Sequence, residues 1–379
     1  MSGFRKGAAM RFLRCIALAS VVMCVPPAAS AGDRPRSVRL NHLQAIGTHN
    51  SFHLEATPAE SAIRRDAGFD DSAVAYSHRP VTEQLETQRM RQLEFDLFAD
   101  PDGGRFAAPR LRRLAGEPTY EPVMHEPGTK VLHIQDYDYR SNCLSLVQCL
   151  RQVRDWSRAN RRHVPLAILL DLKDAALPPG LPAAVPLAWT AARMDEVDEE
   201  IRSVFGRREL IIPDDIRRGR RTLRTAVLRD GWPTLARARG KVMFLMANRD
   251  PYRSRYLVGH RSLAGRVLFT NTRPTRPDAA FVEVNDPRGA GARRIRRFVR
   301  RGLIVRTRAD ADTVEARAND KRRAARALNS GAQWISTDFP AAGTAAHLDS
   351  PYFVGLPYGE TARCNPVTAP TVHPCALER

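Results

Sequence analysis

The chain has 379 residues, of which 43% are hydrophobic and 27% are charged, and its formal net charge is +19. This composition is typical of a globular protein and excludes a wholly disordered or fibrous one. The length is enough to bury a large core as one elaborated α/β domain or as two smaller domains. Arginine supplies most of the positive charge. Genomic base composition explains this preference for arginine as well as a ligand would. We expect no nucleic-acid partner.

The N-terminus has the three parts of an export signal. Four basic residues precede a short apolar segment, residues 15–25, and Ala29-Ser30-Ala31 is typical of a cleavage site. The apolar segment is too short to span a bilayer. We therefore predict that residues 1–31 are a cleaved signal peptide, that the protein is secreted (extracellular or periplasmic), and that residues 32–379 form a single domain.

Four of the six cysteines lie beyond the predicted signal, at Cys143, Cys149, Cys364 and Cys375. An even number in an exported protein indicates disulfides. Three pairings are possible, and we predict the two local ones. Ser145 to Gln148 resembles a capping box, which would start a helix after Cys143 and let that residue fold back toward Cys149. A zinc site is the alternative, but CxxC spacing is missing.

Apolar runs alternate with helical stretches along the mature chain. Eight runs are predicted as strands: 43–49, 93–98, 130–135, 166–172, 241–246, 266–269, 303–307 and 333–337. The predicted helices include 145–159, 194–205, 293–301 and 312–330, the last ending at Gly331. Strands that alternate with helices favour parallel pairing, and eight such units predict a (β/α)8 TIM barrel, an α/β fold, with long insertions. A doubly wound open sheet is the alternative.

The second predicted strand carries two carboxylates on one face. Its alternation places Glu94 and Asp96 opposite the apolar residues of the strand, so that both point into the barrel. Two buried carboxylates repel each other, and a cationic partner is therefore expected. A hard divalent cation with oxygen ligands would satisfy them. Nearby arginines would be the alternative partners.

Three other predicted strands also end in polar residues. His49 and Asn50 lie at the end of the first strand, and His133 lies in the third. Two histidines at the rim of a barrel are better explained as an acid and a base flanking a substrate than as structural residues. In the fourth strand Asp171 and Lys173 share a face. Asp171 is a candidate metal ligand and Lys173 a candidate phosphate ligand, unless the two form a structural ion pair.

Seven segments together form a pattern known from one family. They are Gly47–His53, Glu94-x-Asp96, Gly128–His133, Cys143–Ser157, Arg306–Thr313, Ser330–Asp338 and Arg363–Pro366. This pattern resembles the calcium-dependent, secreted bacterial phosphatidylinositol-specific phospholipase C family. The resemblance covers nearly the whole mature chain from about Leu40.

The resemblance implies a distorted TIM barrel that cleaves phosphatidylinositol to diacylglycerol and inositol cyclic phosphate. It implies that His49 is the general base and His133 the general acid. It also implies Ca²⁺ as cofactor, with Asn50, Glu94 and Asp96 as ligands.

The resemblance implies further site residues. Asp171 stands where such sites usually have a glutamate, which is one methylene longer, so a water could intervene between Asp171 and the metal. Lys173, Arg306 and Asp310 are expected to bind substrate. The loop after the second strand should lie on the catalytic face, where its four arginines would hold the enzyme transiently against anionic lipid: Arg105, Arg110, Arg112 and Arg113.

Two other functions remain open at this point. A glycerophosphodiester phosphodiesterase has the same barrel, paired histidines and Glu-x-Asp strand, but its second histidine typically follows that strand closely. Here His133 lies 37 residues after Asp96. A non-enzymatic binder of polyanions or membrane surfaces is supported only by the charge. The sequence leaves the oligomeric state and the natural inositol substrate undetermined.

Overall fold

The computed structural model describes residues 38–118, 120–369 and 376–378. The predicted signal peptide and Cys375 lie outside the described residues, so cleavage and the Cys364–Cys375 bridge stay predictions. The described residues belong to one compact unit. Within them, no helix is both long enough and apolar enough to cross a membrane.

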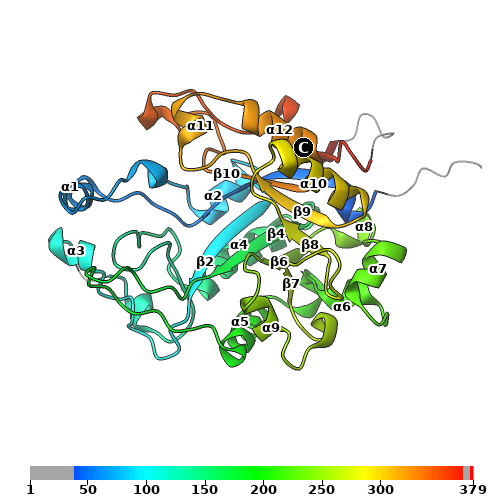
Figure 1. Ribbon diagram of the computed structural model, residues 1–379, viewed down its shortest axis with the longest axis horizontal. Helices are drawn as coiled ribbons and strands as arrows, with labels where there is room; N and C mark the ends of the chain where they lie inside the picture. The colour runs from blue at the N-terminus through cyan, green and yellow to red at the C-terminus, as the bar shows by residue number, and fades with distance from the viewer. Residues whose placement is uncertain (1–37, 119, 370–375, 379) are drawn as a thin grey trace, which may run out of the picture. The chain divides into compact units, whose positions relative to one another are not determined.

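Eight parallel strands follow one another around the centre of the structure (Figure 1). They are β1 (Leu43–Thr48), β2 (Gln92–Phe98), β4 (Leu166–Leu172), β6 (Val242–Met246), β7 (Leu268–Thr270), β8 (Phe281–Glu283), β9 (Ile304–Arg308) and β10 (Trp334–Thr337). Each pairs with the next except β7 with β8, and β10 pairs with β1. A bridge between Asn271 and Phe281 joins β7 to β8. This ring of pairings is the predicted barrel, distorted at the β7–β8 seam.

One predicted barrel strand is wrong, and one barrel strand was missed. Of residues 130–135, only β3 (Lys130–Val131) is a strand, and it pairs antiparallel with the end of β2. The chain then turns at Asp136, whose φ is +66°, and Ile134 pairs back with Asp138. The eighth barrel strand is β8 instead. Its three residues are too few for alternation to reveal them.

Shorter strands extend this sheet. They are β5 (Leu210–Ile211), β11 (Ala362–Cys364) and β12 (Ala376–Glu378). β5 pairs parallel with β6, whereas β11 is antiparallel to both β1 and β12. The pairing of β11 with β1 fastens the C-terminal part of the chain to the first barrel strand.

Helices lie on the connections between strands, as the alternation predicts. They are α1 (Pro58–Asp66), α2 (Val81–Glu86), α3 (Arg110–Leu114), α4 (Leu146–Ala159), α5 (Ala191–Val204), α6 (Pro213–Arg217), α7 (Leu223–Arg229), α8 (Leu235–Ala238), α9 (Tyr252–Tyr256), α10 (Gly289–Arg300), α11 (Val314–Arg317) and α12 (Arg322–Ser330). The predicted helix 312–330 is interrupted near Asn319, whose φ is +47°, and so becomes α11 and α12. Gly331 ends α12 in the left-handed conformation, as predicted. Figure 1 shows α1 and α3 together, beyond one end of the central strands.

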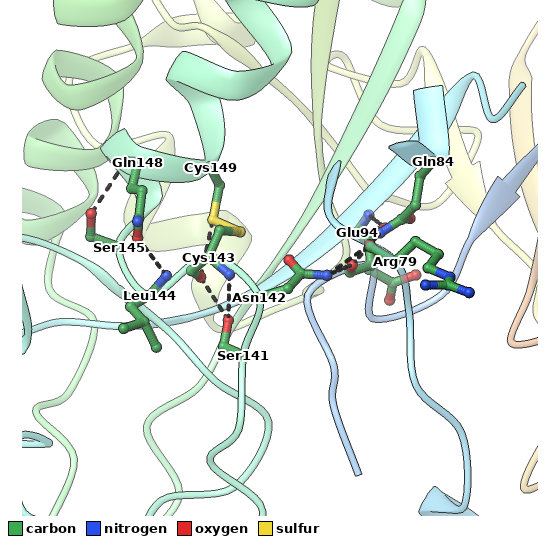
Figure 2. The surroundings of a disulfide bond; sticks show 11 residues. Arg79, Gln84, Glu94, Ser141, Asn142, Cys143, Leu144, Ser145, Gln148 and Cys149 are labelled. Atoms are coloured by element: carbon green, nitrogen blue, oxygen red, sulfur yellow. Dashed lines mark hydrogen bonds between the residues drawn. A yellow bond between two sulfur atoms is a disulfide. The ribbon is translucent and has the colours of Figure 1, made fainter. Parts of the chain in front are cut away.

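The Cys143–Cys149 disulfide is present, as predicted, with its Cα atoms 5.2 Å apart. The helix α4 begins after Cys143 because Ser145 caps it, accepting a hydrogen bond from the Gln148 backbone N–H at 3.2 Å (Figure 2). The Gln148 side chain accepts a hydrogen bond from the Leu144 N–H at 2.8 Å, one residue before the one that a capping box uses. Cys143 therefore lies in a bend before the helix and can reach back to the first turn of α4.

Candidate active site

The polar residues predicted from separate strands gather at the carboxyl ends of the barrel strands. β1 and β2 approach closely at Gly47, where an added Cβ would lie 2.5 Å from the backbone oxygen of Gln92. Only glycine fits this approach. It brings His49 and Asn50, which follow β1, next to the carboxylates of β2. The barrel rim at this end is where catalytic residues of such folds lie.

His49 is held by a carboxylate that follows β10. Its Nδ1 donates a hydrogen bond to Oδ1 of Asp338 at 2.8 Å, since a carboxylate can only accept. The His49 Nε2 therefore carries the lone pair, and Nη1 of Arg308 lies 3.3 Å from it. Burial and the neighbouring Arg308 lower the pKa of His49 well below its usual value, so this imidazole is neutral and can accept a proton.

Asp338 and Arg308 were not among the predicted site residues. Arg308 donates to Oδ2 of Asp338 at 2.9 Å. Burial alone would raise the pKa of Asp338, but its contacts with His49 and Arg308 lower it, so the carboxylate stays ionised. The alternation of β9, which puts Arg308 on the same face as Arg306, was a usable signal for Arg308. Asp338 offered only its position directly after a strand.

His133 is held by a second carboxylate. Its Nδ1 donates to Oδ2 of Asp138 at 2.6 Å, because the turn that ends β3 folds Asp138 back over His133. The same carboxylate lies 3.0 and 3.1 Å from Nε2 of His53, a fully buried histidine. Asp138 and His53 were also not predicted. The site therefore contains two histidine–carboxylate pairs, one for each predicted catalytic histidine.

The contacts of His53 favour its imidazolium form. Its Nδ1 lies 2.9 Å from the backbone oxygen of Tyr76, and its Nε2 faces Asp138, so both ring nitrogens face groups that only accept. Burial alone would lower the pKa of His53, but Asp138 outweighs burial and raises it. The charges of His53 and His133 in turn lower the pKa of Asp138, although burial opposes this.

Glu94 points into the barrel, as the alternation predicts. It forms an ion pair with Arg306 of β9, a strand that does not adjoin β2, so the pair crosses the barrel interior. Arg306 is fully buried and also donates to Glu283 at 2.9 Å and to Asn285 at 2.6 Å. Burial raises the pKa of Glu94 to about 8, even with Arg306 beside it. This arginine is the neutralising partner that the sequence left as an alternative.

Asp96 and Asp171 are direct neighbours in the register of β2 and β4. Lys173 lies between them, with Nζ 3.2 Å from Oδ2 of Asp96 and 2.7 Å from Oδ2 of Asp171. Asn248 donates to the other oxygen of Asp171 at 2.8 Å. Burial raises the pKa of Asp96 to about 6, despite Lys173. The ion pair of Asp171 with Lys173, left open by the sequence, is therefore present.

Asp310 and Arg306 are fully buried, and each supports another residue of the site. Asp310 accepts a hydrogen bond from the backbone N–H of Asp338 at 2.9 Å, and also bonds Thr337 and Tyr352. Burial raises the pKa of Asp310 to about 7. These contacts place Asp310 behind the His49–Asp338 pair and Arg306 behind Glu94.

The predicted calcium ligands have the chemistry of a hard-cation site. Their donors are carboxylate and amide oxygens, which Ca²⁺ prefers. Oδ2 of the buried Asp96 makes no well-formed hydrogen bond; it faces the ammonium of Lys173 at 3.2 Å, a cation that takes the place a metal would occupy. Among the described residues, one other cluster of three potential metal-ligating side chains lies close together: His53, His133 and Asp138. The hydrogen bonds of Asp138 to the two histidines account for this cluster without a metal. The carboxylates of Glu94 and Asp96 are each directed toward a protein cation.

Comparison with known proteins bears on the family and on the fold. A sequence model of the family described as Phosphoinositide phospholipase C, Ca²⁺-dependent, matches residues 38–366. The structure resembles an apo form of a calcium-dependent phosphoinositol-specific phospholipase C from Pseudomonas sp., with a TM-score of 0.54 and 15% identity over 86% of this chain and 95% of that chain. The myoinositol complex of the Pseudomonas protein gives a TM-score of 0.54 and 15% identity over 86% and 96%.

No curated protein sequence matches the chain. At 15% identity, the two structural similarities show the fold. The family match covers nearly all of the described residues. The chain therefore belongs to the Ca²⁺-dependent phosphoinositide phospholipase C family of enzymes.

Proposed function

We propose that the enzyme cleaves phosphatidylinositol to diacylglycerol and inositol cyclic phosphate, with His49 as general base and His133 as general acid. The observation that carries this proposal is the pair of matching contacts at these histidines. Each donates Nδ1–H to a buried carboxylate, Asp338 for His49 and Asp138 for His133. Nε2 of His133 is thereby left to exchange a proton with substrate, and Nε2 of His49 does so once the substrate hydroxyl replaces its 3.3 Å contact with Arg308.

The inositol 2-hydroxyl is the nucleophile in this proposal, because it is already attached near phosphorus and needs no separate binding step. Its oxygen attacks phosphorus while Nε2 of His49 takes its proton. The bond between phosphorus and the glyceryl oxygen breaks, and His133 gives a proton to that oxygen. The products are diacylglycerol and a cyclic phosphodiester. Asp338 stabilises the imidazolium that forms on His49, since its carboxylate is 2.8 Å away.

Asn50, Glu94, Asp96 and Asp171 are the residues that we propose hold Ca²⁺. When bound, the cation supplies acidity to the attacking hydroxyl and offsets charge that develops on phosphate. Asp171 is the only one of the four that is appreciably exposed, with 27% of its side chain accessible, and one oxygen is committed to Asn248. A water between Asp171 and the cation would fit that geometry.

Lys173 is the most accessible of the proposed substrate ligands, because 31% of its side chain is exposed whereas Arg306 is fully buried. We propose that Lys173 binds the substrate phosphate. Arg306 and Asp310 would then act behind the substrate, by orienting Glu94 and the backbone of Asp338.

A lipid-docking surface at the same end of the barrel is the second part of the proposal. It consists of Arg105, Arg113 and Leu114 from the loop after β2 and Val185 from the loop after β4. All four are exposed, with Leu114 at 54% and Val185 at 65%. Arg105 donates to the Val185 carbonyl at 3.1 Å, so the two loops adjoin. Apolar tips beside arginines that form no ion pair with any described residue suit an anionic bilayer surface.

Arg112 does not belong to this docking surface. It forms an ion pair with Glu117 at 3.0 Å, and its guanidinium lies 4.8 Å from the ring centre of Tyr120. Arg110 is only partly exposed, and with Arg105 and Arg113 it lines a cavity of about 260 Å³. Arg112 therefore stabilises the loop, whereas Arg105 and Arg113 are the arginines available to lipid.

Export of the mature enzyme completes the proposal. The Cys143–Cys149 disulfide supports it, because structural disulfides persist in oxidising compartments. N-terminal sequencing of the secreted protein tests the predicted cleavage, with Gly32 as the expected first residue.

The proposed activity is tested by supplying phosphatidylinositol vesicles with Ca²⁺ and then with a chelator. Phosphorus NMR should show inositol cyclic phosphate before any linear phosphate, and the chelator should abolish turnover. Full activity in chelator, phosphatidic acid as the lipid product, or faster cleavage of a soluble glycerophosphodiester would each overturn the proposal.

A further inference from the structure

Tyr76 lies between the two histidine–carboxylate pairs, although no pattern in the sequence singled it out. It follows the short 3-10 helix η2 (Ser72–Val74) in the connection from β1 to β2, and its side chain is buried. Its ring centre is 4.6 Å from that of His53 and 6.4 Å from that of His49. A single buried residue thus adjoins the proposed base itself and His53, the histidine that contacts the carboxylate holding His133.

The Tyr76 hydroxyl is the acceptor for the side-chain amide of Asn50. Nδ2 of Asn50 donates to it at 3.1 Å. An amide has its donor on one side and its acceptor on the other, so this bond turns the Asn50 carbonyl oxygen away from Tyr76. Asn50 is buried, with a φ of +44°, so its backbone conformation is unusual for a residue other than glycine and its amide depends on protein partners.

An asparagine that gives its oxygen to a cation must place its N–H groups elsewhere. A cation repels the amide N–H, and a buried N–H without an acceptor carries a desolvation cost. The Tyr76 hydroxyl removes that cost because it offers an oxygen to Nδ2. The other nearby group, Nδ1 of His49, is 3.5 Å from the hydroxyl and already donates its hydrogen to Asp338.

The backbone around Tyr76 holds the hydroxyl in place. Its carbonyl oxygen accepts from Nδ1 of His53 at 2.9 Å. Two residues later, the His78 N–H donates to the His53 carbonyl at 2.9 Å, and His78 Nε2 donates to the His49 carbonyl at 2.8 Å. Tyr76 is therefore fixed to the segment that carries the proposed base and, through His53, to the carboxylate that holds the proposed acid.

We propose that Tyr76 is a positioning residue that orients Asn50 with its carbonyl oxygen toward the calcium site. The inference rests on the proposed function, in which Asn50 is a ligand. Tyr76 touches neither substrate nor metal in this role. It acts by keeping the ligand amide from flipping, so its loss should weaken calcium binding and leave the chemical step intact.

The test is Tyr76→Phe, which keeps the buried ring against His53 and removes only the hydroxyl. Titration calorimetry of the substrate-free protein should show Ca²⁺ affinity reduced about tenfold, the effect of leaving one buried N–H unpaired. Turnover at saturating Ca²⁺ should stay within about twofold of the parent, since the histidine pairs are untouched. Unchanged Ca²⁺ affinity in a folded Tyr76→Phe protein would overturn the inference.

A rescue variant separates orientation from general damage. Asn50→Asp supplies carboxylate oxygens and has no N–H that needs an acceptor. Adding Tyr76→Phe to Asn50→Asp should therefore leave Ca²⁺ affinity unchanged, and a further tenfold loss there would contradict the inference. If the Tyr76→Phe single variant folds poorly, the comparison of Asn50→Asp with the double variant still tests the inference.

Two further variants complete the design. Tyr256→Phe removes an equally buried hydroxyl, which bonds Asp198 and the backbone N–H of Leu268 at the start of β7. This hydroxyl lies at the opposite end of the barrel, so its loss should not change Ca²⁺ affinity. Asn50→Ala tests the ligand itself. If Asn50→Ala weakens Ca²⁺ binding but Tyr76→Phe does not, the role of Tyr76 fails alone. If neither weakens it, the proposed ligand set fails as well.

Discussion

Nζ of Lys173 lies 2.7 Å from Oδ2 of Asp171 and so holds a positive charge between two of the proposed calcium ligands. The second contact, to Asp96, is 3.2 Å. These carboxylates raise the pKa of Lys173 although burial opposes them, so the amine is charged. The ammonium group and Ca²⁺ would therefore compete for the same oxygens, and Lys173 must move from at least one of them when the cation binds.

Lys173→Met should accordingly bind Ca²⁺ more tightly, by roughly threefold to tenfold, because the competing charge is gone. Turnover should nevertheless fall, on the order of tenfold, if the displaced amine serves the substrate phosphate. Calorimetry and steady-state kinetics measure the two effects separately. Lys321→Met, at an exposed position, is the matched control. Weaker Ca²⁺ binding in Lys173→Met would rule out the competition.

Calcium affinity should rise with pH between about 6 and 8. Burial raises the pKa of Asp96 to about 6 and that of Glu94 to about 8. Below these values the carboxyls hold protons that Ca²⁺ must displace, and above them the ligands are already ionised, so the rise should level off. Calorimetry at pH 7 in buffers of different ionisation enthalpy should show proton release on binding. Glu94→Gln should abolish most of that release, and a pH-independent affinity would contradict this assignment.

Each catalytic histidine should depend on its carboxylate. His49→Ala and His133→Ala should each lose on the order of a hundredfold or more in turnover, in the range of general acid–base groups, while still binding Ca²⁺. Asp338→Asn and Asp138→Asn should lose much of the same activity, because an amide no longer stabilises an imidazolium. Asp198→Asn, remote from the site, is the control. Full activity in both asparagine variants would show that the two carboxylates are not needed for catalysis.

The proposed docking surface predicts a difference between substrates. Arg105→Gln with Arg113→Gln should weaken binding to anionic vesicles, since each arginine near such a surface contributes about 1 kcal/mol. Cleavage of a soluble phosphodiester should change little. The same pair of changes at Arg297 and Arg300, on the exposed face of α10, provides the charge-matched control. Equal losses on vesicles and on soluble substrate would exclude an interfacial role, and so would equal losses in the control.

The Cys143–Cys149 disulfide should stabilise the fold near the site. Asn142, next to it, donates to the Ser51 carbonyl at 3.1 Å and to the Arg79 carbonyl at 2.9 Å, so the bridged loop holds the turn that carries His49 (Figure 2). Replacing both cysteines by serine should lower the free energy of unfolding by about 2 kcal/mol, as expected for a short loop. Urea unfolding measures this. An unchanged midpoint would mean that the bridge is dispensable.

The sequence by itself determined the features that depend on local pattern. Alternation in β2 correctly placed Glu94 and Asp96 inside the barrel, because side chains of a strand alternate whatever surrounds it. The capping residue Ser145 predicted where α4 begins, and with it the Cys143–Cys149 bridge. Gly331 predicted the end of α12 for the same reason, since its left-handed backbone is a local property.

Only the tertiary structure decided which distant residues complete the site. His49 and Asp338 are 289 positions apart, and His53 and Asp138 are 85 apart, so no local period relates them. Residues 130–135 have the alternation of a strand, yet the turn at Asp136 ends the strand early and brings Asp138 to His133. Tyr76 gave no signal because its role depends on contacts with Asn50 and His53 that exist only once the barrel has formed.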